Sequence, residues 1–392
     1  MSKITCQLCG EQTHAIQVHL RHSHPEVSIE EYKAQYPDAP LMSEAAARAV
    51  AAKQLQKVAM AGTAVAASED DDDQTNVATL PGASRKAPLH EAFKLGAVKA
   101  AMNARGEPIP VTVLGQHDFP DMVADEDPNY VWNIDLLKTA MMAIEINTPC
   151  MLWGFHGTGK TTIWEQISNS TNRPMIRVQH TASMVEDDIL GRWTVKDGET
   201  VFEYGPLPLA MMHGWLYLAD EYDFAFPQIL GVYQPVLEGK PLLIKEAPDG
   251  KRLIKPHKNF RFVATGNTNG SGDETGLYQG TNIQNAANYS RFGITEQVNY
   301  MVKKQESLMV QQQASIVEED ANAIVDWASE VRKAYEAGKI GMTVGPRELI
   351  NAARTGAMKS SFRRGVELAI TNRYSKVDRE IANEIAQRFL SS

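Results

Sequence analysis

The sequence predicts an α/β protein built on a parallel β-sheet, with a small all-helical domain after it and a small cysteine–histidine module before it. Three observations lead to this prediction. After about residue 91, apolar strand-like runs alternate with helical stretches, which is typical of a parallel sheet covered by helices on both faces. Beyond Val302 the pattern is helical only. Near the N-terminus, cysteines and histidines stand close together, as metal ligands do.

Length and composition exclude several classes of protein. Of the 392 residues, 43% are hydrophobic and 22% charged, so the chain can bury a core of normal size and is not globally disordered. The net charge of −9 excludes a general nucleic-acid coat protein, although it leaves room for a local basic patch. The odd count of 3 cysteines argues against a disulfide framework. Since neither a secretory signal nor a run of 18 apolar residues is evident, we expect a cytoplasmic protein without membrane contact.

Four zones follow one another along the chain. We expect a zinc-finger-like module over residues 1–43, an alanine-rich helix and acidic flexible linker over 44–90, the α/β core over 91–300 and a helical lid domain over 301–392. The alanines between 45 and 67 favour helix. Five consecutive carboxylates at 69–73 repel one another, so we read 68–88 as flexible.

The elements of the core can be assigned in order from hydrophobic runs and turn residues. We expect a helix ending near 146, a buried strand at 149–153, a helix at 160–168, and strands at 175–178, 215–221 and 260–267. Two hairpins are also expected: 193–195 with 200–202 around Asp197 and Gly198, and 242–244 with 252–254 around 248–250.

Residues 154–161, GFHGTGKT, fit the pattern G-x-x-x-x-G-K-[ST] of a phosphate-binding loop. Glycines let backbone N–H groups close around phosphate oxygens, and the helix that follows offers its positive N-terminal end to the same anion. We expect Lys160 to reach the β- and γ-phosphates and the Thr161 hydroxyl to hold Mg²⁺. The predicted nucleotide contacts are Gly154, His156, Gly157, Thr158, Gly159, Lys160, Thr161, Thr162 and Asp220.

Two later strands end in residues that would complete this site. A buried strand at 215–219 would place Asp220 beside the phosphate loop, where it can hold Mg²⁺ through water, and Glu221 where it can polarise an attacking water. Asn267, at the end of the strand 260–267, could hydrogen-bond the γ-phosphate or that water, although asparagine is also a common turn former. The alternative for Asp220 and Glu221 is an ordinary strand that ends in charged residues, which the phosphate loop about 60 residues earlier argues against.

Together these motifs resemble an AAA+ ATPase of the MoxR branch. The most specific stretches are NFRFVATGNT at 259–268 and GDETGLYQGT at 272–281, with support from DEYD at 220–223 and DPNY at 127–130. Within the branch they are similar to the CobS family, the ATP-hydrolysing subunits of aerobic cobaltochelatase, over about residues 105–390. The resemblance implies ATP and Mg²⁺ as cofactors and a homo-oligomeric, hexameric ring. It also implies a protein client, such as a metal chelatase subunit or a protein with a von Willebrand factor A (VWA) domain.

The resemblance implies catalytic roles for two arginines. Arg291 matches the arginine finger that acts on the nucleotide of a neighbouring subunit, and Arg347 matches the sensor-2 arginine of the helical lid. The family usually has Asp before the finger, where this chain has Ser290. An acidic neighbour would help orient the guanidinium group, so this difference weakens the assignment of Arg291. The alternative for each arginine is a surface ion pair, which contributes little.

The N-terminal zone has the residue types of a small zinc site. Cys6, Cys9, His19 and His24 follow the spacing C-x2-C-x9-H-x4-H, and thiolate and imidazole suit tetrahedral Zn²⁺. The spacing resembles fingers of the prokaryotic Ros/MucR type; His22 could replace His24, His14 is a further candidate, and two free thiols are the alternative. Residues 1–43 carry three basic against five acidic side chains, which disfavours phosphate contacts, so we expect a finger that docks protein.

The sequence therefore predicts a Mg²⁺-dependent ring ATPase that remodels a protein client, without nucleic acid as partner. A DNA-directed motor is the first alternative, because related helicases share such hairpins. It would require basic hairpin tips; the tip at 196–199 is mixed in charge, and the second, with Lys245, Lys251 and Arg252, is mildly basic. A scaffold gated by nucleotide binding alone is the second alternative.

Overall fold

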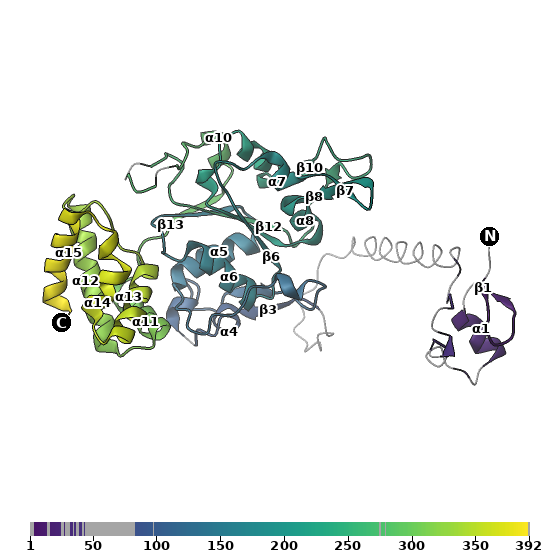
Figure 1. The fold of residues 1–392 in the computed structure, drawn as a ribbon, viewed down its shortest axis with the longest axis horizontal. Coiled ribbons are helices and arrows are strands. Elements are labelled where there is room, and N and C mark those ends of the chain that lie inside the picture. Colours follow the sequence, from purple (N-terminus) through teal and green to yellow (C-terminus); the bar gives the residue numbers. More distant parts are fainter. Residues whose placement is uncertain are drawn as a thin grey trace. The chain divides into compact units, whose positions relative to one another are not determined.

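The computed structural model describes residues 4–13, 16–24, 27, 32–33, 35–36, 39–40, 43, 83–96, 98–273, 276–278 and 280–390 (Figure 1). They belong to two compact units, one within residues 1–78 and one within 79–392, and each is described by itself. The predicted helix at 44–67 and most of the predicted linker lie outside the described residues.

The second unit contains a five-stranded parallel sheet with the strand order β13-β5-β12-β9-β6. Its strands are β5 (Cys150–Trp153), β6 (Met175–Gln179), β9 (Leu216–Asp220), β12 (Arg261–Gly266) and β13 (Ile294–Gln297). All residues of β9 are buried, which explains why its sequence is apolar up to the final residue, Asp220. The predicted parallel α/β sheet is confirmed.

Two apolar clusters cover the two faces of this sheet, because successive strand residues point to opposite sides. On one face, Met151, Tyr217 and Phe262 join the side chains of α8. On the other, Cys150 and Leu152 join the side chains of α5 and α6. The helices of this part are α5 (Ile134–Glu145), α6 (Lys160–Ser170), α7 (Glu186–Leu190), α8 (Pro206–His213), α9 (Gln234–Leu237) and α10 (Ala286–Tyr289). Short 3₁₀ turns lie at Lys99–Ala101, Pro120–Met122, Tyr222–Phe224 and Ile229–Tyr233.

The prediction of a flexible linker up to residues 88–90 is wrong at its end. Strand β3 (Arg85–Pro88) pairs in antiparallel fashion with β4 (Pro110–Val113), and α4 (Leu89–Ala92) follows at once. Ala87 is buried, and Leu89 is buried in the apolar cluster that contains α5, so this segment is attached to the core. The acidic run at 69–73 and the residues Pro81 and Gly82 are typical of linkers, and they concealed this strand in the sequence.

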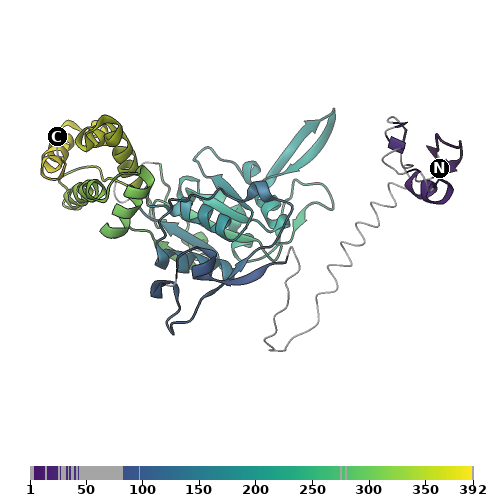
Figure 2. The same cartoon turned by 90° about the horizontal axis from the view of Figure 1, so that it is seen from below.

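Both predicted hairpins are present. β7 (Gly191–Lys196) pairs with β8 (Glu199–Tyr204), and β10 (Leu242–Leu243) pairs with β11 (Leu253–Ile254). Asp197 and Gly198 both have positive φ, 52° and 81°, as the tight turn between β7 and β8 requires. Figure 2 shows this hairpin, in teal, extending beyond the rest of the core.

From residue 303 to residue 390 the described chain is helical, as predicted. Its helices are α11 (Lys303–Ala314), α12 (Glu318–Glu336), α13 (Pro346–Lys359), α14 (Phe362–Ala369) and α15 (Lys376–Phe389), with a 3₁₀ turn at Thr371–Arg373. They enclose an apolar cluster of their own around Trp327 (green to yellow in Figure 1). Among the described residues, no helix combines the length and apolar content needed to cross a membrane.

The first unit is small. Strands β1 (Ile4–Thr5) and β2 (Gln12–Thr13) form an antiparallel pair, and α1 (Ile16–Ser23) follows. Its described buried apolar cluster consists of Cys6, Ile16, Leu20 and Tyr32.

Candidate nucleotide site and cysteine–histidine site

The phosphate loop connects β5 to α6, and three of its glycines have the positive φ that this path requires. Gly154, Gly157 and Gly159 have φ of 140°, 73° and 87°. At Gly154 a Cβ atom would come within 2.4 Å of a backbone oxygen of Val298, so only glycine fits. The loop geometry thus explains the glycine spacing seen in the sequence.

Lys160 opens α6 and places its ammonium group over the loop. Its side chain is buried, and Nζ donates to the backbone oxygens of Gly154 (2.7 Å) and Phe155 (2.8 Å) and to Oδ1 of Asn267 (3.3 Å). Burial lowers the pKa of Lys160 to about 8, although the carboxylates of Asp223, Asp220 and Glu221 act in the opposite direction. A bound phosphate would compensate this buried charge.

Asp220 and Thr161 meet as the sequence predicts. Asp220 ends β9 with 1% of its surface exposed, and its Oδ1 accepts hydrogen bonds from the hydroxyl of Thr161 (2.8 Å) and from that of Thr265. Its Oδ2 accepts from Nε of Arg177 at 2.7 Å. A hydroxyl and a carboxylate side by side are oxygen ligands of the kind that Mg²⁺ takes together with water and phosphate. No sequence motif pointed to Thr265 or Arg177 as partners of Asp220.

Glu221 leaves the sheet through a sharp turn. Its φ of 53° is in the left-handed region, which is sparsely populated for residues other than glycine and is frequent at functional sites. Its backbone N–H donates to the hydroxyl of Thr265 (3.1 Å), and its carboxylate accepts from Nε2 of Gln179 (2.7 Å). The half-buried carboxylate of Glu221 is therefore held by partners of its own, although Glu221 directly follows Asp220 in the chain.

Asp223 holds Asn267 in place, a role that sequence reasoning missed. Its fully buried Oδ2 accepts from the backbone N–H groups of Asn267 (2.9 Å) and Thr268 (2.8 Å) and from the Thr268 hydroxyl (2.8 Å). Burial raises the pKa of Asp223, against the effect of these hydrogen bonds. The only sequence signal was a third carboxylate within the stretch DEYD.

A cavity of about 240 Å³ lies beside the phosphate loop. The loop and first turn of α6, residues 157–162, form one wall. The other lining residues are Asp127, Tyr130, Val131, Met301, Met309, Gln313, Pro346, Arg347 and Ile350. Nε2 of Gln313 donates to the carboxylate of Asp127 at 2.7 Å, which joins two of these walls. Arg347 lines the cavity as a lid residue, and a Cβ atom at Gly157 would lie 3.5 Å from its own Cβ.

Three of the predicted nucleotide contacts, Gly154, His156 and Asp220, do not line this cavity. The backbone oxygen of Gly154 accepts from Lys160, and the ring of His156 lies against the lid, with Nε2 3.2 Å from Oε1 of Glu348. The backbone N–H of His156 donates to the hydroxyl of Tyr278 at 2.9 Å. In the described structure His156 therefore connects the loop to the lid.

Arg291 follows α10 and is not among the residues that line the cavity of its own chain. Its Nε donates to Oε1 of Glu238 at 2.7 Å, and 26% of its side chain is exposed.

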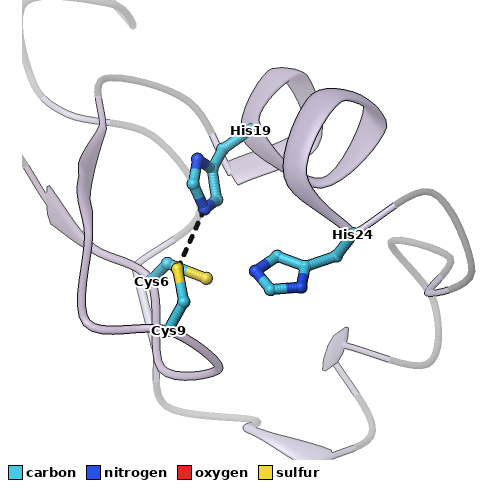
Figure 3. A group of neighbouring side chains, drawn as sticks. All are labelled: Cys6, Cys9, His19 and His24. Atoms are coloured by element: carbon cyan, nitrogen blue, oxygen red, sulfur yellow. Dashed lines mark hydrogen bonds between the residues drawn. The ribbon is translucent and has the colours of Figure 1, made fainter.

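The N-terminal unit brings Cys6, Cys9, His19 and His24 together (Figure 3). One ligand atom from each lies within 4.8 Å of all the others, and Sγ of Cys9 is 3.2 Å from Nε2 of His19. Both sulfur atoms and both imidazole rings point toward a common centre. The four ligand atoms of a tetrahedral Zn²⁺ site, each about 2.0 to 2.3 Å from the ion, are slightly closer to one another than the 4.8 Å limit seen here. The donor set therefore fits zinc in both chemistry and spacing.

Neither of the two alternative ligands is among the described side chains. His14 lies outside the described residues, and the side chain of His22 is not described. Nδ1 of His19 lies 3.8 Å from a carboxylate oxygen of Glu11, an arrangement that leaves Nε2 free to face the sulfur atoms.

Residues 149–292 match the AAA domain of the dynein-related subfamily. The aerobic cobaltochelatase subunit CobS of a Sinorhizobium species is 32% identical over 277 residues, which cover 68% of this chain and 82% of that protein. An uncharacterized protein of Staphylococcus saprophyticus is 28% identical over 171 residues, 42% of this chain and 61% of its own length. Among solved structures, RuvB of Thermotoga maritima matches with a TM-score of 0.38 at 13% identity, over 68% of this chain and 73% of that chain.

Proposed function

This chain belongs to the AAA ATPase family of the cobaltochelatase subunit CobS, and from that premise we propose that it is the ATP-driven ring of a protein-remodelling machine of the MoxR branch. As an ATPase of this family it uses ATP and Mg²⁺. The observation that carries the proposal is the junction of the phosphate loop with β9, where the Thr161 hydroxyl and the Asp220 carboxylate are 2.8 Å apart next to the Lys160 ammonium group. This is the arrangement that phosphoryl transfer requires.

In the proposed mechanism the loop residues 157–162 and the start of α6 bind the phosphates. Lys160 exchanges its contacts with Gly154 and Phe155 for phosphate oxygens and keeps its proton there, because an anion raises the pKa of a buried ammonium group. Thr161 and Asp220 would hold Mg²⁺, which neutralises charge that develops on the transferred group.

The remaining side chains act on the attacking water and on the γ-phosphate. Glu221, fixed by Gln179, orients and polarises the water. Asn267, with its backbone held by Asp223, hydrogen-bonds the γ-phosphate or that water. Arg347 approaches from the lid across the cavity. Binding of ATP therefore draws the lid toward the core, and this movement is what a client would sense.

Hydrolysis would depend on ring assembly through Arg291. We assign this residue as an arginine finger that acts on the nucleotide of the next subunit in a hexamer. Its place outside the cavity of its own chain supports this assignment. Arg291→Ala is expected to leave ATP binding intact and to lower hydrolysis about 10³- to 10⁵-fold, the usual contribution of such a finger. Arg252→Ala, on an exposed hairpin, is the matched control and should retain full turnover.

Mixed rings test the assignment directly. Arg291→Ala subunits keep a complete nucleotide site, and Lys160→Ala subunits keep the finger. Each is inactive alone, and a mixture should recover activity because the finger acts in trans. Full turnover by pure Arg291→Ala rings would refute the assignment, and so would a mixture that stays inactive although both proteins assemble.

The two hairpins are the proposed contact for a protein client, such as a metal chelatase subunit or a VWA-domain protein. The exposed fractions of Val195, Leu243 and Leu253 are 70%, 55% and 57%. The Trp193 indole donates to the backbone oxygen of Glu246 at 2.9 Å, so the hairpins form one joined surface. Exposed apolar side chains of this kind mark protein contacts.

A DNA-directed motor remains the alternative function, and the charges at the hairpins weigh against it. Lys196 pairs with Glu203, and Arg252 pairs with Asp249 at 3.3 Å, so two of the four basic residues named at the hairpins are compensated within the chain. Hydrolysis that rises on addition of DNA and loses this response at high salt would favour the motor. Purification from the native source with mass spectrometry of bound proteins would identify the client.

We also assign Zn²⁺ to the site of Cys6, Cys9, His19 and His24 and propose that this module docks a protein. Metal analysis of the purified full-length chain should find one zinc per chain. The acidic composition of residues 1–43 supports a protein partner over DNA.

A further inference from the structure

The guanidinium group of Arg291 is held by a carboxylate that lies far away in the sequence. Its Nε donates to Oε1 of Glu238 at 2.7 Å, across a separation of 53 residues. Glu238 directly follows α9 as its C-terminal cap, and Arg291 follows α10. A charged donor and a charged acceptor make the stronger kind of hydrogen bond and fix a planar guanidinium in one orientation.

The residue directly before the arginine does not perform this task. The hydroxyl of Ser290 donates to the backbone oxygen of Ala287 at 3.0 Å, so it is used within its own helical turn. Nη1 of Arg291 donates to the same backbone oxygen. Among the described residues, Nη2 of Arg291 has no hydrogen bond, and it remains available to an acceptor from outside the chain.

A second contact between α9 and α10 makes this arrangement rigid. Nε2 of Gln234 donates to Oδ1 of Asn288 at 2.6 Å. Gln234 and Glu238 are one helical turn apart, and Asn288 and Arg291 are three residues apart. The contact between Gln234 and Asn288 and the contact between Glu238 and Arg291 are therefore neighbours. Leu237, which precedes Glu238, and Phe292, which follows Arg291, are buried in the same apolar cluster.

We propose that Glu238 is the positioning residue of Arg291 and supplies from α9 the acidic orienting group that Ser290 cannot provide. This inference rests on the proposed role of Arg291 as a finger in trans. The pair is partly exposed, so it adds little to folding stability. The pair instead orients the guanidinium group of Arg291, and a misplacement of a catalytic group by about 1 Å can cost on the order of 100-fold in rate.

The experiment uses full-length subunits in the mixed rings described above. Lys160→Ala subunits donate the finger, and Arg291→Ala subunits hydrolyse ATP. Glu238→Gln on the donor should lower the recovered kcat by about 10- to 100-fold at unchanged KM for ATP. Glu238→Gln on the Arg291→Ala subunit should cause no further loss, because no finger remains there to be positioned.

Each other outcome is informative. Equal losses from Glu238→Gln on either subunit would mean a structural role and overturn the inference. Unchanged activity, or higher activity, would also overturn it, since Glu238 would then be dispensable or would restrain the finger. If the mixture of single variants recovers no activity, the trans finger itself fails, which is a separate result.

A matched control isolates the contact. Lys240 binds the other oxygen of Glu238, with Nζ 2.5 Å from Oε2, and does not contact Arg291. Lys240→Ala on the donor should retain the recovered activity. A loss as large as that of Glu238→Gln would show that the charge balance at Glu238, and not its bond to Arg291, is what matters, and would overturn the inference.

Discussion

The nucleotide site and the cysteine–histidine site are both built from short loops next to a helix, but they relate to their folds in opposite ways. The phosphate loop lies on a five-stranded sheet with an apolar cluster on each face. The N-terminal unit has four described buried apolar residues, and one of them, Cys6, is itself a site residue. Changes in the first site should therefore cost activity and leave the fold intact, whereas changes in the second should cost the fold.

Removal of zinc is expected to have the largest effect. A structural zinc site in a small module contributes on the order of 10 kcal/mol to folding, so Cys6→Ser or a chelator should unfold the N-terminal unit. NMR spectra should lose the dispersed signals of residues 1–43 while the ATPase unit keeps its melting temperature.

Two histidine variants sharpen this prediction. His24→Ala should lose zinc, because His24 belongs to the assembled group, whereas under this assignment His22→Ala should keep it. Zinc retention by His24→Ala would reassign the fourth ligand. Dispersed signals that survive complete chelation would contradict the idea that the site carries the fold.

Lys160→Ala is the corresponding test of the nucleotide site. We expect it to reduce ATP affinity about 100-fold or more, since it removes a charge-assisted contact to phosphate, and to abolish hydrolysis. The melting temperature without nucleotide should stay the same or rise, because burial already disfavours this charge. Isothermal titration and thermal unfolding measure both effects. A fall in stability as large as the loss of binding would contradict the contrast between the two sites.

Glu221→Gln should separate binding from turnover. The amide still accepts the hydrogen bond from Gln179 but is a poor base, so hydrolysis should fall about 10²- to 10⁴-fold at unchanged ATP affinity. This variant also tests the scaffold alternative. If it still activates its client fully, nucleotide binding alone performs the function; failure to do so supports a need for hydrolysis.

The lowered pKa of Lys160 predicts a pH dependence that the zinc module does not share. The protonated ammonium binds phosphate, and burial lowers its pKa to about 8, so deprotonation of Lys160 should make ATP affinity fall above about pH 8, by up to about tenfold per unit. In the nucleotide-free protein the same shift favours folding at high pH, and this advantage is lost as pH falls from about 10.5 to 8. Constant affinity up to pH 9.5 would refute the prediction.

The sequence predicted the parts of the molecule that depend on local spacing. Lys160, Thr161 and Asp220 were assigned because a strand, a glycine loop and a helix follow one another within a few residues, and a buried strand must end at the same edge of the sheet. Contacts such as that of Asp220 with Arg177 depend on strand order, which one sequence does not reveal. The bond from Arg291 to Glu238 is of the same kind, because its two residues are 53 positions apart in the sequence.

The smallest expected effect concerns the link between loop and lid. Oε1 of Glu348 lies 3.2 Å from the ring of His156, and Oε2 accepts from the backbone N–H of Gly345 at 3.0 Å, where α13 begins. Burial acts to raise the pKa of Glu348, but the hydrogen bond and charge of His156, together with a backbone hydrogen bond and the charge of Arg373, outweigh it and lower this pKa. Glu348→Gln keeps the cap of the helix and weakens the pair, so ATP affinity should fall about two- to fivefold, since such pairs contribute less than about 1 kcal/mol.

Glu367→Gln, which alters an exposed pair with Arg364 on α14, is the control and should leave affinity unchanged. Equal effects of both variants would indicate a general loss of lid charge, whereas an effect of Glu348→Gln alone would assign to His156 a coupling role that its place in the motif does not reveal.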